Sequence, residues 1–313
     1  MCAKSQRCDA RERVRRSLAE ALAVVYPREV FNDPNTWSQA RRLDAVALAL
    51  VGGDSEPPDG AERSASYLLD RLAAYRQVAL AAYASARPLY ERALAIREKA
   101  LGPDHPDTAT SLNDLAVLVL AQGDLAAAQL LYERALAIYE KRLGRNHPVI
   151  AVSLDNLAGL LQAQGKLASA RPLVKRALAI RENALGPNHP DTASSLNNLA
   201  NLLRAQGDLA AARPLYKRAL AIREQELGPD HPDTATCLNI LALVLQAQGE
   251  LAAARPVSER ALAIREKAPS GHEKSVCSQL RNSGRSSNSR KTARRREMLG
   301  RGALGATGGR ADL

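Results

Sequence analysis

The chain has 313 residues, of which 46% are apolar and only 3% aromatic, and its formal net charge is +11. This length allows one or two domains, and an interior rich in Ala and Leu favours closely packed helices. The cysteines lack paired spacing, which argues against disulfides and a zinc site. The longest apolar runs are far shorter than the roughly 20 residues of a membrane-spanning helix, which argues against a membrane span. Both observations favour a cytoplasmic protein.

Residues 1–53 form the first region, for which we predict a helical segment. Its basic start resembles a signal sequence only superficially, because Glu20 breaks the apolar stretch and no cleavage signature follows. Residues 54–61 are rich in turn formers, and we predict a linker there.

A motif that recurs at a fixed period starts at Leu101. The run Leu-Gly-Pro-Asp-His-Pro-Asp-Thr of residues 101–108 returns in related form from residues 143, 185 and 227, each copy 42 residues after the last. Such a period is typical of a chain that stacks one supersecondary unit on its neighbours. We therefore predict a solenoid over residues 62–268.

Each repeat has the pattern of two helices. In the first full copy, Pro106 occupies a preferred first helical position, and apolar residues recur at spacings of three and four until Gly123. Asp124 is a plausible N-cap of the second helix, which ends at Gly144. In the leading repeat we expect the first helix at residues 67–80, with Ala81 where the turn glycine of the other repeats stands.

Several short runs carry a resemblance to a known family. Leu196 to Ala200 reads Leu-Asn-Asn-Leu-Ala, Tyr132 to Ile138 reads Tyr-Glu-Arg-Ala-Leu-Ala-Ile, and Ala-Gln-Gly forms the inner turn. Together with the linker motif, these runs resemble the tetratricopeptide repeat in the 42-residue form of kinesin light chains. The resemblance implies an all-α, right-handed superhelical solenoid of about five helix pairs, with atypical first and last repeats.

The region before the repeats has a resemblance of its own. Tyr26-Pro27, Asn35-Thr36-Trp37 and Arg42-Leu43 are similar to the helical stretch that joins an NB-ARC-type signalling ATPase to its tetratricopeptide repeats in large bacterial proteins. This leaves open that the chain is a degenerate fragment of such an ATPase. The sequence contains no Gly-x-x-x-x-Gly-Lys-Ser/Thr loop, so the nucleotide-binding domain is absent from it.

The repeat pattern stops at Pro269, and residues 269–313 are rich in Ser, Arg and Gly. Ten Lys and Arg against three acidic residues give this stretch +7 of the +11. We predict a basic disordered tail, either an ordinary one or the product of a frameshift. Any binding of nucleic acid or another polyanion by this tail would be weak, non-specific and strongly salt-dependent.

The first helices carry the candidate site. If their apolar residues face the partner helix, the residues one step past them project to the other side. In the tetratricopeptide family that side lines a concave groove, and asparagine there can pair with the backbone of an extended peptide. The resemblance thus implies a site at Asn113, Val117, Leu120, Asp155, Gln162, Asn197, Asn201, Arg204, Asn239 and Gln246. Alternatively, the asparagines bond only to neighbouring repeats.

Other candidate sites are weaker. Four histidines in register cannot converge on one metal ion, so we assign them a structural role at the start of each first helix, and we expect no metal or cofactor. No nucleophile motif is present, and Asp114 and Asp155 give no sign of a raised pKa. We expect Tyr132 and Tyr216 in the core and the pairs Glu133-Arg134 and Lys217-Arg218 as solvated charges. The sequence predicts a non-enzymatic scaffold for a protein or peptide ligand.

Overall fold

The computed structural model describes residues 2–31, 33–53, 56–57 and 59–267, and these residues form helices without any strand. After α1 (Cys2–Val25), the short 3-10 helix η1 (Pro34–Thr36) and α2 (Trp37–Val51), the helices come in consecutive pairs. The pairs are α3 (Glu62–Val78) with α4 (Tyr83–Leu101), α5 (Pro106–Gln122) with α6 (Leu125–Leu143), α7 (Pro148–Ala163) with α8 (Leu167–Leu185), α9 (Pro190–Ala205) with α10 (Leu209–Leu227), and α11 (Pro232–Ala247) with α12 (Leu251–Lys267).

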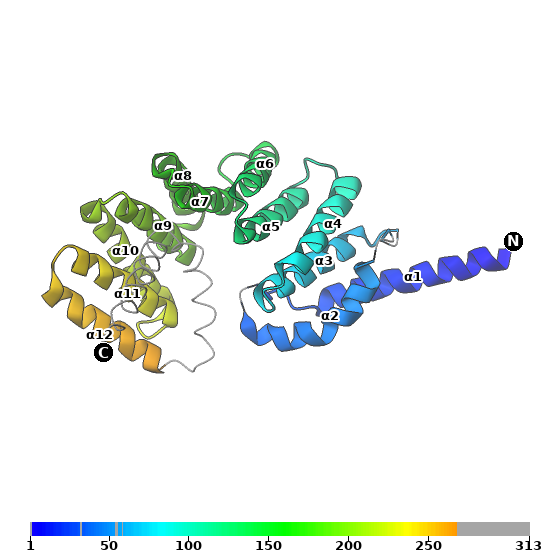
Figure 1. Ribbon diagram of the computed structural model, residues 1–313, viewed down its shortest axis with the longest axis horizontal. Coiled ribbons are helices and arrows are strands. Elements are labelled where there is room, and N and C mark those ends of the chain that lie inside the picture. Colours follow the sequence, from blue (N-terminus) through cyan, green and yellow to red (C-terminus); the bar gives the residue numbers. More distant parts are fainter. Residues whose placement is uncertain (1, 32, 54–55, 58, 268–313) are drawn as a thin grey trace, which may run out of the picture.

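The pairs stack side by side into an arch (Figure 1). The first helices α5, α7, α9 and α11 lie on its inner side and the second helices on its outer side, while α1 extends away from the arch. The predicted all-α repeat solenoid is confirmed. The predicted basic tail, residues 269–313, lies outside the described residues, as does part of the predicted linker.

The residues of the recurring linker motif form the ends of helices. In its third copy, Gly186 follows α8 with φ of 96°, a backbone conformation that favours glycine. His189 is the N-cap of α9, and its Nδ1 accepts the backbone N–H of Asp191 at 3.1 Å. The hydroxyl of Thr192 donates to the carbonyl of Gly186 at 2.8 Å. The motif therefore ends one helix and starts the next within a few residues.

All four in-register histidines are N-caps of this kind. Each imidazole Nδ1 accepts the backbone N–H two residues ahead, at 3.1 to 3.3 Å, and these residues are His105, His147, His189 and His231. This geometry confirms the structural role predicted for them.

The inner turns of the repeats differ at the leading pair. Gly123 has φ of 93° and closes α5 in the left-handed conformation, as predicted. In the leading pair Ala81 takes this role with φ of 52°, despite its Cβ. The first helix there was expected at residues 67–80, but α3 begins at Glu62 and ends at Val78.

Small residues let the helices approach closely. Ala116, Ala158 and Ala200 in the first helices and Ala128 and Ala170 in the second helices have no exposed surface. Tyr132 and Tyr216 are buried at 1% exposure, which confirms them as core residues. Burial of these small side chains stabilises the helices, because most helical stability in proteins comes from tertiary packing.

The N-terminal helices close one end of the solenoid. Buried side chains of the region before α3, including Tyr26, Val30 and Ala47, belong to the same core cluster as Leu68 and Leu72 of α3. Arg76 of α3 forms an ion pair with Asp44 of α2 at 3.0 Å. The face of α3 that points away from the later repeats is therefore covered.

The outer side of the arch carries a row of ion pairs that the sequence analysis missed. Arg134 of α6 binds Glu98 of α4 at 2.6 Å, and Arg218 of α10 binds Glu182 of α8 at 2.7 Å. The pairs of Glu140 with Arg176 and of Glu224 with Arg260 repeat the arrangement. Arg134 and Arg218 are exposed, as predicted, but stacking also brings each arginine beside the glutamate of the preceding repeat.

Candidate functional site

The predicted site residues all lie on first helices, and these helices form the inner side of the arch (Figure 1). Arg204 and Gln246 are exposed, and the other eight are half-buried. They come from α5, α7, α9 and α11, in equivalent repeat positions rather than in one compact cluster. The arrangement is thus a row along the arch.

The asparagines of this row contact the next repeat. Asn113 Nδ2 donates to Ser153 Oγ at 3.0 Å, and Asn197 Nδ2 donates to Cys237 Sγ at 3.6 Å. The Oδ1 atoms of both asparagines are buried without a hydrogen-bond partner. Each asparagine therefore spends one of its two N–H groups on holding neighbouring repeats together, as the structural alternative predicts.

Asp155 belongs to a buried charged group. Arg181 of α8 is 8% exposed and donates both to Asp155 and to the hydroxyl of Ser195 on α9. Burial raises the pKa of Asp155, and Arg181 acts in the opposite direction. Arg181 thus links Asp155 of its own repeat to Ser195 of the following repeat.

The leading repeat has the same group with a shifted register. Arg97 binds Asp70 at 2.5 Å and also donates to Ser111, so Asp70 is the counterpart of Asp155. A strict 42-residue period would place Arg71 there, because Asp70 lies 85 residues before Asp155. Arg97 and Arg181 were not among the predicted site residues, although an arginine stands at this position in four of the repeats.

Asp114 departs from the prediction of an ordinary carboxylate. Burial, together with the negative charge of Asp70, raises the pKa of Asp114 to about 7, while Arg71 and Arg97 lower it. The prediction failed because α3 and α5 bring the two carboxylates together only in the folded chain.

Asn201 is engaged as well. The hydroxyl of Tyr216 donates to Asn201 Oδ1 at 2.7 Å, so this amide anchors α10 to α9. The apolar members Val117 and Leu120 pack against the main core cluster. Among the polar members of the ten, five side chains enter no hydrogen bond between repeats within the described part of the chain: Gln162, Asn201, Arg204, Asn239 and Gln246. Arg204 does bond the hydroxyl of Tyr216 in its own repeat.

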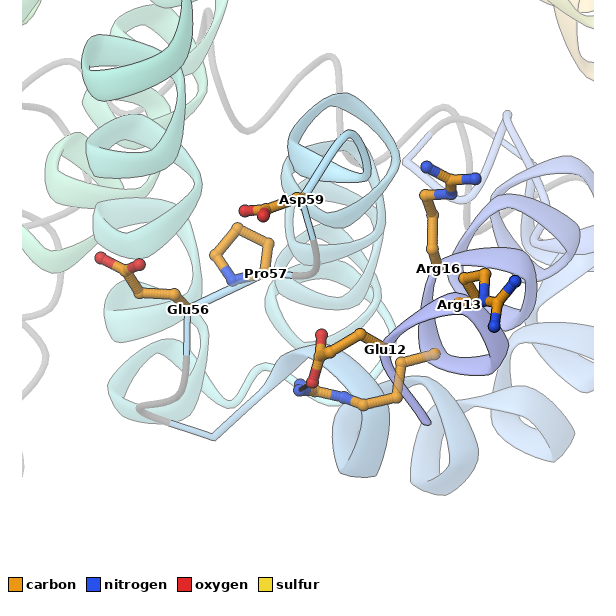
Figure 2. Close-up of a pocket in the computed structure, with 7 residues that line it drawn as sticks. Glu12, Arg13, Arg16, Glu56, Pro57 and Asp59 are labelled. Carbon is orange, nitrogen blue, oxygen red and sulfur yellow. Dashed lines mark hydrogen bonds and ion pairs between the residues drawn. The ribbon is translucent and has the colours of Figure 1, made fainter. Parts of the chain in front are cut away.

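A pocket of about 500 Å³ lies elsewhere, between α1 and the segment before α3 (Figure 2). Its walls are formed by Glu12, Arg13, Arg15, Arg16, Glu56, Pro57 and Asp59. Nearly all of these side chains are charged, whereas small-molecule sites are lined predominantly by apolar groups. We assign no ligand to it.

Within the described residues, no group of three or more His, Cys, Asp or Glu side chains could hold a metal ion. The thiol of Cys237 is buried and forms no disulfide, and burial raises the pKa of this thiol. No described helix combines the length and the apolar character needed to cross a bilayer.

Comparisons with known proteins agree with this architecture. The sequence model of the tetratricopeptide repeat matches residues 64–141, 149–225 and 195–267. The kinesin light chain nearly identical TPR-like repeats from Podosopora anserina superpose with a TM-score of 0.56 at 30% identity, over 66% of this chain and 96% of that one. BtubC (BKLC) from P. vanneervenii gives a TM-score of 0.62 at 27% identity, over 74% of this chain and 89% of that one.

A Rap protein complexed with Competence and Sporulation Factor has a TM-score of 0.53 at 14% identity, over 82% of this chain and 78% of that one, which shows the fold alone. No curated protein matches the sequence. The resemblance of residues 11–53 to an NB-ARC-associated segment stays a prediction. The family match, which covers more than half of the chain, leads to the conclusion that this protein belongs to the tetratricopeptide repeat family.

Proposed function

We propose that the chain is a non-enzymatic scaffold that binds an extended peptide segment of another protein along its first helices. The observation that carries this proposal is the row of partly exposed polar side chains at repeating positions on these helices. Asn197 keeps one N–H beyond its contact with Cys237, and Asn239 has no hydrogen-bond partner among the described residues. Such groups suit the backbone of an extended chain, whose donors and acceptors also recur at regular intervals.

A second repeat position adds specificity. It holds Gln162, Arg204 and Gln246 on three successive first helices, and Arg204 and Gln246 are exposed. Arg204 would favour a peptide with an acidic residue at the corresponding position, because guanidinium and carboxylate pair well.

The experiment is selection of peptides from a displayed random library on the full chain, followed by affinity measurements on the selected peptides. The test variant combines Gln162→Ala, Arg204→Ala and Gln246→Ala, and these changes leave the joints between repeats intact. We expect at least tenfold weaker binding, because three polar contacts from one row are lost.

The matched control is Arg255→Ala on α12, whose side chain is 81% exposed and pairs with Glu259 of the same helix. Circular dichroism and thermal melting show whether both variants keep the fold. Equal affinity of the triple variant and the parent, or failure to select any peptide, would contradict the proposal.

A further inference from the structure

The two ends of the solenoid differ, because the last helix pair lacks a cover. Leu262 of α12 is 57% exposed, whereas Leu220, its counterpart one repeat earlier, is 9% exposed. Leu251 at the start of α12 is 67% exposed, whereas its counterparts Leu125, Leu167 and Leu209 are half-buried. We call the outward side of α11 and α12 the end face. Leucines of this face are exposed to solvent, whereas their counterparts in earlier repeats are partly or fully buried.

The interior joints show what covers an equivalent face. Leu178 of α8 packs against a cluster that contains Ala193 and Leu196 of α9. Leu136 of α6 packs likewise against a cluster that contains Leu154 of α7. In each case the first helix of the following repeat contributes a buried leucine to the cluster that covers the leucine of the preceding second helix.

A polar contact accompanies this packing at every interior joint. The preceding repeat supplies an arginine or asparagine donor, and the following first helix supplies a small hydroxyl or thiol acceptor. The contacts are Arg97 with Ser111, Asn113 with Ser153, Arg181 with Ser195, and Asn197 with Cys237. On the end face the matching donors are Asn239 and Arg265, and neither has a hydrogen-bond partner within the described residues.

Two possible occupants fit this face less well. A second copy of the chain has no open first helix to offer at its other end, because α1 and α2 cover α3. The sequence that follows α12 departs from the repeat, with Pro269-Ser270-Gly271-His272 where Leu-Gly-Pro-Asp should stand. It therefore lacks the motif that starts the covering helix at every interior joint.

We infer that the end face of α11 and α12 is a docking site for one amphipathic helix of a separate polypeptide. This helix has the chemistry of the chain's own first helices, with a serine, threonine or cysteine directly before a leucine that packs on Leu262. The hydroxyl or thiol accepts from Arg265 or Asn239. The site extends the interface that already holds the repeats together. It shares Asn239 with the row of predicted site residues on the first helices and is otherwise separate from that row.

The probe is a labelled synthetic peptide of residues 189–206, which contains the N-cap and helix of α9 and carries Ser195 and Leu196. Its binding to the full chain is measured by fluorescence anisotropy. We expect saturable binding that weakens at least tenfold in Leu262→Glu, because a carboxylate would then face the peptide's leucine. A peptide with Leu196→Asp should lose affinity to the same degree.

The matched control is Leu130→Glu on α6, where the native leucine is 69% exposed and belongs to an interior repeat. This variant should bind the peptide as the parent does. Absence of binding, or equal binding by Leu262→Glu, would overturn the inference.

Hydrogen–deuterium exchange and sedimentation velocity distinguish the other occupants. Protection of α12 on peptide addition supports the inference. A dimer that Leu262→Glu dissociates would identify a second copy as the occupant, and protection of residues 269–313 that Leu262→Glu removes would identify the chain's own tail. Either result would overturn the proposed partner.

Discussion

Asp114 is a carboxylate at a repeat position that elsewhere holds an amide or an apolar residue. The equivalent residues are Asn156, Asn198 and Ile240. Because the folded state raises the pKa of Asp114 to about 7, its protonated form is favoured by folding, and ionisation opposes folding. The contribution of this carboxyl is present below pH 4 and is lost as the pH rises through about 7.

The variant Asp114→Asn should therefore gain stability relative to the parent as the pH rises. We expect a gain of up to about 4 kcal/mol at pH 8.5 and of less than about 1 kcal/mol at pH 4, since one pKa unit corresponds to about 1.4 kcal/mol. Urea denaturation at a series of pH values measures this difference. Glu226→Gln, at an exposed position near the end of α10, serves as the control. A pH-independent difference for Asp114→Asn would show that the carboxyl ionises normally.

At the scale of an element, each first helix depends on the signals at its own start. The N-cap His189 accepts a backbone N–H that would otherwise lack a partner, and Pro190 follows it. This local arrangement explains why the same motif precedes four first helices. In this arrangement Nδ1 of His189 is the acceptor of the cap.

Replacement of His189 by alanine should cost about 1 kcal/mol of unfolding free energy, the usual cost of losing an N-cap. His189→Asn keeps a side-chain acceptor and should recover most of this loss. Thermal melts and urea titrations of the two variants, compared with the parent, make the test. If both variants lose the same stability, the imidazole contributes by packing rather than by capping.

At the scale of the whole molecule, stability comes from the contacts between neighbouring helix pairs. Leu154 of α7 has no exposed surface and packs in a cluster with Ala109 and Leu112 of α5 and Ala177 of α8. Distant pairs share no contact with it, because each pair packs on its neighbours in sequence.

Leu154→Ala should cost about 2 to 5 kcal/mol, the range for removing a buried leucine side chain. The variant should exchange its backbone amide hydrogens faster than the parent. This acceleration should be largest in α5 to α8 and smallest in α11 and α12. Leu130→Ala, at a solvent-exposed leucine, should leave exchange unchanged. A uniform acceleration along the chain would show that the arch unfolds as a single cooperative unit.

The fold could be predicted in detail because its signals are local. Gly123 ends α5 and Asp124 caps α6 through the backbone N–H of Ala127 at 3.0 Å, both within a few residues of the positions they control. The site was less predictable. Asn113 and Asp155 are held by Ser153 and Arg181, which come from other helices, so their contacts could not be predicted from their own segments.

The amino-acid sequence was enough to predict the helix pairs, their 42-residue period and the residues that begin and end the helices after the leading pair, because capping and turn formation act over a few bonds. Three features depend on the packing of the helices and could not be predicted: which charges are buried, the one-residue shift of α3, and the exposure of Leu262 where Leu220 is buried. The physical reason is that burial and electrostatic coupling depend on which helices pack together. Side chains in equivalent repeat positions thus acquire different properties from different neighbours.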